Sequence, residues 1–224
     1  MIFSADTWQV TLFSIAVGLA STLLILPFGI TLAWLFARKE WPLKSLFETI
    51  VLLPLVMPPV STGLILLKIF GRRSPVGQWL YQMGFEIVFN WKGVLIAMAV
   101  MSFPLLVRSV RTSFAEVNPR LEQIAATLGA SPLKIFFVVT IPLAYKGIVA
   151  GALLAFSRAL GEFGATILLA GNIPGRTQTL SLAIYNFVQL GKDPEAYVLL
   201  GITVVLAFLF VWTSEWLLRT EKKV

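Results

Sequence analysis

The sequence predicts an all-α integral membrane protein with about five transmembrane helices, and three observations predict it. First, 58% of the 224 residues are hydrophobic and 13% are charged, whereas a soluble domain carries about 25% charged residues. Second, the apolar residues gather in five stretches long enough to cross a bilayer, which needs about 20 residues. Third, lysine and arginine are unevenly divided between the loops. One soluble core could not bury so much apolar surface, so we expect the lipid bilayer to be the solvent of this chain.

The five expected spans follow one another along the chain. Their approximate ranges are 8–36, 46–70, 91–110, 147–170 and 196–218. The second contains Leu53-Pro-Leu-Val-Met-Pro-Pro-Val60, which predicts a kinked or distorted helix inside a bundle, where neighbours satisfy the freed carbonyls. The segment 177–190 is amphipathic, so six spans are the alternative. Residues 1–6 lack the basic start of a signal peptide, and the first stretch exceeds a signal's apolar region, so we expect a retained span.

The positive charges orient the chain, because lysine and arginine are enriched in cytoplasmic loops. With the N-terminus outside, five basic residues fall on the outer face, Lys68 and Arg158 fall within spans, and eleven fall on the inner face. The outer residues are Arg72, Arg73, Lys92, Arg176 and Lys192. The inner residues are Arg38, Lys39, Lys44, Arg108, Arg111, Arg120, Lys134, Lys146, Arg219, Lys222 and Lys223. This excess predicts an outer N-terminus and a cytoplasmic C-terminus.

The composition also argues against several classes of function. The chain has no cysteine and no histidine, so it lacks a thiol nucleophile, the commonest general base and the commonest metal ligand. No G-x-x-x-x-G-K-[ST] phosphate loop occurs. We therefore expect no catalytic residue, no metal, no cofactor and no nucleic-acid partner, and a membrane-embedded enzyme is disfavoured. The absence of a convincing internal repeat disfavours the inverted-repeat architecture of many secondary transporters.

The inner segment from Arg111 to Lys146 is the most unusual part of the chain. Asn118 and Pro119 predict the start of a short helix, and Gly129 predicts its left-handed end. The chain then restarts at the N-cap Ser131, and a second helix is expected to run from Leu133 to Ile141, up to Pro142. An apolar stripe follows the first helix at Leu121, Ile124, Ala125 and Leu128. A connector helix lying on the membrane is the simplest interpretation of this pattern.

The spacing resembles the cytoplasmic signature of ABC importer permeases, which is Glu-Ala-Ala, three residues, Gly, nine residues, Ile, one residue and Leu-Pro. Counted from Gly129, the last part becomes Val139-Thr-Ile-Pro142, and the Glu-Ala-Ala positions hold Gln123-Ile-Ala125, with Glu122 one residue early. The resemblance implies a coupling segment, about 113–146, that docks in a cleft of a separate ATPase subunit. The residues that it assigns to coupling are Glu122, Gln123, Ala125, Gly129, Ala130 and Pro142.

The fourth expected span carries two charges near its middle. Arg158 and Glu162 are four residues apart, which places them on one face of a continuous helix. An unpaired arginine facing lipid costs about 3 kcal/mol on insertion scales, so the pair is expected to face protein or a path. One interpretation is an ion pair that packs helices together. The other is a translocation path in which Arg158 attracts an anion and Glu162 restrains that attraction, with Ser157 and Thr166 as candidate hydrogen-bond donors.

Two further stretches, 157–167 and 171–179, resemble the permeases of molybdate ABC transporters. Sulfate permeases share the Arg-Ala-Leu-Gly-Glu core but typically continue with Tyr-Gly-Ser, where this chain has Phe163-Gly-Ala-Thr166. The resemblance implies one permease domain over 1–224 with a type I ABC importer fold, present as a homodimer in the cytoplasmic (inner) membrane. It also implies an ABC ATPase subunit, a periplasmic molybdate-binding protein, and molybdate or tungstate as the ion. The alternatives are a sulfate/thiosulfate permease and, more remotely, an ion-gradient-driven secondary transporter.

Overall fold

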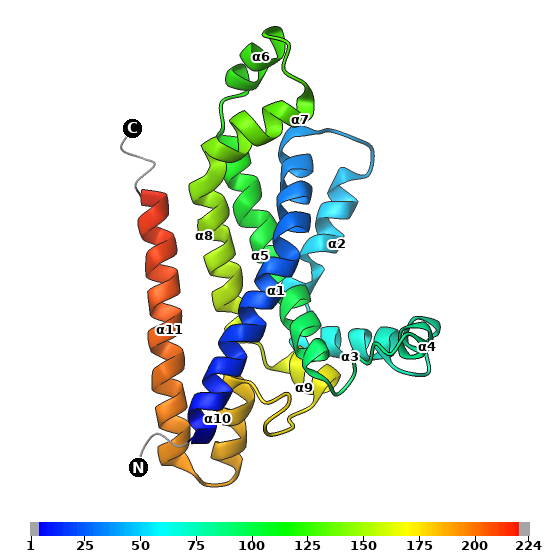
Figure 1. Cartoon of the computed structure of the whole chain (residues 1–224), viewed down its shortest axis with the longest axis vertical. Helices are drawn as coiled ribbons and strands as arrows, with labels where there is room; N and C mark the ends of the chain where they lie inside the picture. Colours follow the sequence, from blue (N-terminus) through cyan, green and yellow to red (C-terminus); the bar gives the residue numbers. More distant parts are fainter. Residues whose placement is uncertain (1–4, 220–224) are drawn as a thin grey trace.

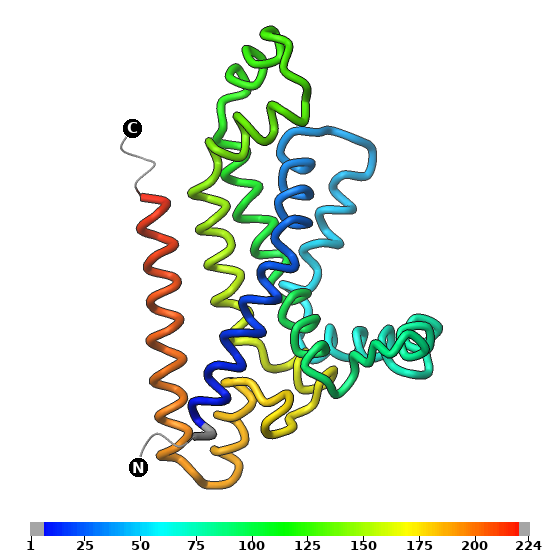
Figure 2. Tube along the Cα trace, viewed as in Figure 1, coloured from blue at the N-terminus to red at the C-terminus, as the bar shows by residue number. Residues whose placement is uncertain are grey.

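In the computed structural model, residues 5–219 are described and form a bundle of helices without any strand (Figures 1 and 2). Four helices are long: α1 (Ala5–Arg38), α5 (Trp91–Glu116), α8 (Ile141–Leu160) and α11 (Asp193–Arg219). The remaining elements are α2 (Lys44–Val56), α3 (Pro59–Phe70), α4 (Pro75–Gln82), α6 (Pro119–Thr127), α7 (Pro132–Ile135), the π-helix η1 (Phe136–Thr140), α9 (Gly164–Ala170) and α10 (Leu180–Gln189). Lys222 and Lys223, which entered the charge count, and residues 1–4 of the expected N-terminus lie outside the described residues.

The centre of the bundle is the contact of α1, α5 and α8. Its main buried cluster includes Phe36 of α1, Leu106 and Phe114 of α5, and Ile148 of α8. The last helix, α11, packs on α8 and α10 and leaves most of its surface uncovered, with Phe208 65% exposed. A helix that is apolar on an uncovered face is a lipid-facing helix. These features confirm the predicted all-α membrane fold.

Small residues let α5 and α8 approach closely. A Cβ at Gly147 would lie 2.5 Å from Cβ of Ser113, closer than atoms of this kind pack, whereas a Cβ at Gly201 of α11 would meet nothing within 4 Å. Close approach through glycine is a common way to pack helices in membranes. The close helix contact at Gly147 is therefore a contact within the chain.

We predict that Gly147→Ala destabilises the protein, because overpacking a helix contact costs about 1–3 kcal/mol. For a chain of this size that loss lowers the Tm in detergent by about 5 °C. The double substitution Gly147→Ala with Ser113→Gly is expected to recover most of the loss, since the nearest remaining atom would be Cα of residue 113 at 3.7 Å. Gly201→Ala is the matched control. An unchanged Tm for Gly147→Ala alone contradicts this packing.

The second expected span is broken rather than simply kinked. The helices α2 and α3 meet at an angle of 112°, so α3 runs across the bundle and carries α4 away from it (Figure 1). Met57 and Pro58 are both extended, with ψ of 146° and 130°. Each precedes a proline, and a residue before proline is driven out of the helical region. Four helical stretches are long and apolar enough to cross a membrane, and the α2–α3 pair taken as one gives a fifth, among residues 5–219.

The fourth span is displaced from its expected position. The apolar helical stretch runs over 132–160, through α7, η1 and α8, instead of over 147–170. The expectation that a helix stops at Pro142 is wrong, because the π-helix leads into α8 without a break, with Ile141 N–H donating to Phe136 O directly before Pro142. At the other end the helix stops at Leu160, and α9 is separate. Helix α10 has 10 residues, about 15 Å, which is too short for a sixth span.

Candidate functional site

The helix α6 is built as its sequence predicts and projects beyond the bundle (Figure 1). Oδ1 of Asn118 accepts a hydrogen bond from Arg120 N at 3.0 Å, and Pro119 occupies the first turn. At the other end Gly129 has φ of +84°, its N–H donates to Ala126 O, and Ala130 N–H donates to Ala125 O. These two bonds are those of a Schellman C-cap, and the turn leads directly into α7. The helix–turn–helix is therefore fixed by local chemistry.

The apolar stripe of α6 is exposed. Leu121, Ile124 and Leu128 are 44%, 56% and 82% exposed, and α6 contains no buried residue. Of the predicted coupling residues, Gln123 and Gly129 are exposed, Glu122, Ala125 and Ala130 are half-buried, and Pro142 is exposed on α8. Apolar side chains of a projecting helix in this position are available to a partner.

The carboxylate of Glu122 points back to the bundle. Oε1 accepts a hydrogen bond from Thr140 Oγ1 at 2.7 Å, and Oε2 lies 3.3 Å from Nε of Arg38 at the end of α1. Arg38 also donates from Nη2 to the carbonyl of Val117 at 2.8 Å. Sequence reasoning missed Arg38 and Thr140, because Arg38 counted only as one of many inner charges and Thr140 as a spacer in the signature.

Arg158 and Glu162 lie on two sides of a helix break. Arg158 is in the last turn of α8, while Glu162 follows its C-terminus, so they do not share one continuous helical face as expected. They still form an ion pair, with Nη1 of Arg158 2.9 Å from Oε2 of Glu162. Oε1 of Glu162 accepts a hydrogen bond from Ala165 N at 2.8 Å, which caps α9. The Glu162 side chain is 1% exposed and that of Arg158 is 28% exposed, so only the arginine reaches the surface of the chain.

The two hydroxyl candidates differ in their surroundings. Ser157 is half-buried on α8, and Thr166 is buried on α9 with no hydrogen-bond partner for Oγ1 among the described residues. Thr62 of α3 is also buried, and its Oγ1 also has no hydrogen-bond partner among the described residues. Helix α3 packs against α9, and the two backbones approach closely at Gly63 and Ala165. The structure therefore places two unpartnered hydroxyls on a pair of packed helices close to the charged pair.

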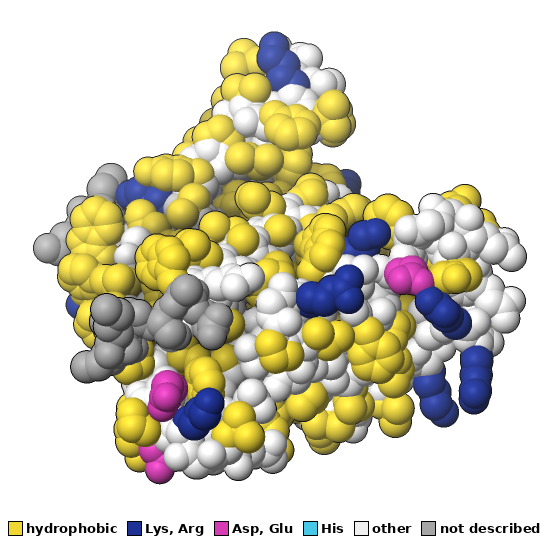
Figure 3. All heavy atoms as spheres, turned by 60° about the horizontal axis from the view of Figure 1, so that its bottom comes forward, with side chains coloured by type: hydrophobic (Ala, Val, Ile, Leu, Met, Phe, Trp, Pro, Cys, Tyr) yellow, Lys and Arg dark blue, Asp and Glu magenta, His cyan; other side chains and the backbone are white. Residues whose placement is uncertain are grey.

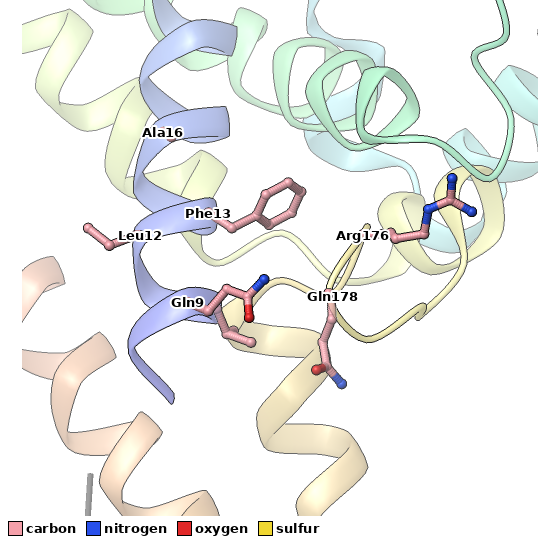
Figure 4. A pocket seen from close by; sticks show the side chains of 8 residues that line it. Gln9, Leu12, Phe13, Ala16, Arg176 and Gln178 are labelled. Atoms are coloured by element: carbon pink, nitrogen blue, oxygen red, sulfur yellow. The ribbon is translucent and has the colours of Figure 1, made fainter. Parts of the chain in front are cut away.

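The end of the molecule opposite α6 contains a pocket of about 340 Å³ (Figure 4). It lies between the first turns of α1 and the 171–179 loop and is lined by Gln9, Val10, Leu12, Phe13, Ala16, Gly175, Arg176 and Gln178. Most of its lining is apolar, and Arg176 and Gln178 point in different directions (Figure 4). Lysine and arginine side chains are spread over this end of the molecule (Figure 3).

Comparisons with known proteins give consistent results. The family described as "Binding-protein-dependent transport system inner membrane component" matches residues 6–219. The molybdenum transport system permease protein ModB of Escherichia coli is 44% identical over 225 residues, covering 100% of this chain and 98% of the relative. Its counterpart from Haemophilus influenzae is 44% identical over 212 residues, covering 94% and 93%. The sulfate transport system permease protein CysT of Salmonella typhimurium is 34% identical over 186 residues, covering 83% and 67%.

Among solved structures, the chain is similar to one from a bacterial alginate ABC transporter in complex with its alginate pentasaccharide-bound periplasmic protein. The TM-score is 0.74 at 18% identity, with 99% of this chain and 81% of that chain covered. At this identity the likeness concerns the fold alone. It agrees with the predicted type I importer permease architecture.

Proposed function

We propose a function from one premise: the chain belongs to the family of binding-protein-dependent transport system inner membrane components. It is a multi-pass protein of the inner membrane and the permease subunit of an ABC importer that moves molybdate. The observation that carries the choice of ion is the 44% identity to a molybdenum permease over the whole chain, against 34% over a shorter stretch for a sulfate permease. Tungstate is a second candidate ion because it is also a tetrahedral dianion.

The coupling segment, about 113–146, is the proposed contact with a separate ABC ATPase subunit. This proposal is supported by the exposed apolar stripe on α6, a helix that projects from the bundle and has no buried residue. On this proposal the α6 end is cytoplasmic, the N-terminus is outside, and ATP is hydrolysed in the partner. Gln123, Ala125, Gly129, Ala130 and Pro142 shape or border the docking surface, while Glu122 faces the bundle.

The proposed translocation path includes the exposed side of Arg158. Its guanidinium is held at one edge by Glu162, which leaves its remaining N–H donors for an anion. Ser157 on the same helix and the unpartnered hydroxyl of Thr166 are the proposed polar neighbours. A charge restrained in this way attracts a dianion without holding it tightly. The chain acts as a homodimer in this proposal, with the path between the copies and a periplasmic molybdate-binding protein delivering the ion.

The proposal is tested by reconstituting the chain with its ATPase subunit and binding protein in proteoliposomes. We expect ATP-dependent molybdate uptake. Excess tungstate should inhibit this uptake, whereas sulfate at the same concentration as the tungstate should leave it nearly unchanged. Inhibition by sulfate as strong as that by molybdate contradicts the choice of ion and favours the sulfate alternative. Uptake that needs no ATPase subunit but follows an ion gradient contradicts the importer.

A further inference from the structure

The polar group formed by Arg38, Glu122 and Thr140, here called the clasp, joins three separate elements. Glu122 is in the first turn of α6, Arg38 is the last residue of α1, and Thr140 is the last residue of η1. The carboxylate accepts from the threonine at 2.7 Å and pairs with Nε of the arginine at 3.3 Å. The arginine also holds the carbonyl of Val117, in the link between α5 and α6. One carboxylate thus ties α6 to two helices that are not its neighbours in the chain.

The clasp stands out because α6 has little else to hold it. No residue of α6 is buried, so apolar packing does not fix its orientation against the bundle. The side chains of Arg38 and Glu122 are 13% and 20% exposed, although the residues around Glu122 on α6 are largely exposed. A pair shielded to this degree is screened less by salt than a surface pair. The clasp is therefore a shielded polar restraint on the position of α6.

The clasp also ends at a point where the helix geometry is unusual. Thr140 closes the five-residue π-helix that leads into α8, and Ile141 N–H donates to Phe136 O across it. Single π-turns frequently mark functional sites, because an inserted residue lets a helix change its register at low cost. Helix α1 packs along both α5 and α8. A displacement of α6 would thus reach α1 through Arg38 and the start of α8 through Thr140.

We propose that Glu122 is a positioning residue for energy coupling, whose carboxylate transmits movement of α6 to α1 and to the π-helical start of α8. This inference rests on the proposed docking of an ATPase on α6. It gives Glu122 a role inside the permease, in place of a direct contact with the ATPase, and makes Arg38 and Thr140 its partners. At its position one residue early in the signature, the carboxylate faces the bundle.

The test uses the complete transporter in proteoliposomes, with molybdate uptake and ATP hydrolysis measured on the same vesicles. Glu122→Ala is expected to lower molybdate taken up per ATP by about tenfold. Glu122→Gln, which keeps an acceptor for Thr140, and Thr140→Val are expected to lower it less. Assembly with the ATPase should remain normal in all three. Glu40→Gln is the control, because it removes an ion pair with Lys44 at the same end that does not involve α6, with Glu40 87% exposed.

A charge exchange separates transmission from simple folding. Arg38→Glu alone is expected to uncouple uptake, and Arg38→Glu with Glu122→Arg to recover a large part of the uptake per ATP. Normal coupling in assembled Glu122→Ala transporter overturns the inference, as does uptake that falls only in proportion to the assembled complex. Failure of the proposed function looks different, because the unmodified transporter would then show no ATP-dependent molybdate uptake.

Discussion

Replacing Gly129 with valine is expected to remove most molybdate uptake while the protein still inserts and folds. Gly129 has φ of +84°, a left-handed conformation that costs an L-residue about 1–2 kcal/mol and a β-branched one more. No heavy atom lies within 4 Å of a Cβ built at this position, so the effect is one of backbone conformation and not of a clash. The turn between α6 and α7 would open and change the direction of α6. Since about 1.4 kcal/mol corresponds to a factor of ten, we expect a tenfold loss of uptake or more.

A series at the same position isolates the backbone effect. Asparagine tolerates the left-handed region, so Gly129→Asn is expected to retain most uptake. The uptake by Gly129→Asp is expected to lie between those of the valine and asparagine variants. Aspartate has a backbone cost similar to that of asparagine, but it also adds a charge to the docking surface. Gly191→Val is the matched control, with φ of +67° and the same open surroundings in the turn at the other end of the molecule. Equal uptake by the valine and asparagine variants at Gly129 would show that the turn geometry does not matter for coupling.

The local parts of the site were predictable because local chemistry determines them. Asn118, Pro119, Gly129 and Ser131 are cap and turn residues whose effect depends on two or three neighbours in the chain. The structure has each of them in the expected role, except that the helix begun at Ser131 does not stop at Pro142. A proline interrupts a helix because it lacks an N–H and because its ring clashes with a carbonyl of the preceding turn, and the π-turn before Pro142 changes the spacing of the backbone groups there.

The parts that depend on contacts distant in sequence were not predictable. From its hydropathy, the segment 147–170 was predicted to be a single span. The buried residues where α8 ends and α9 begins are as apolar as the interior of a helix, so composition alone does not reveal the break. The break became visible only with Glu162 capping α9 and with Gly164 packed against Pro59 of α3. The three prolines at 54–59 indicated where the second span is distorted, but the angle of 112° is set jointly with that packing. The pairing of Glu122 with Arg38 likewise needed the fold.

Arg158→Ala is expected to reduce the amount of folded protein sharply. It leaves the carboxylate of Glu162, 1% exposed, with only the N–H of Ala165 as a partner. Removing one member of a buried ion pair costs about 3–5 kcal/mol, which is a large part of the stability of an ordinary protein. The measurement is the fraction of monodisperse protein recovered from membranes in detergent. If recovery equals that of the unmodified chain, then loss of Arg158 does not leave Glu162 as a buried, unpaired charge.

Adding a second substitution, Glu162→Gln, tests whether Arg158 also attracts the transported anion. In Arg158→Ala with Glu162→Gln, the amide oxygen still accepts from Ala165 N, and no buried charge remains, so folding is expected to recover. Molybdate uptake is nevertheless expected to stay at least tenfold low, because an exposed guanidinium on the path has been removed. The matched control is Arg111→Ala with Glu48→Gln, which removes a 3.0 Å pair between α5 and α2. If the first double variant takes up molybdate as fast as the control, the pair only joins α8 to α9 and the anion passes elsewhere.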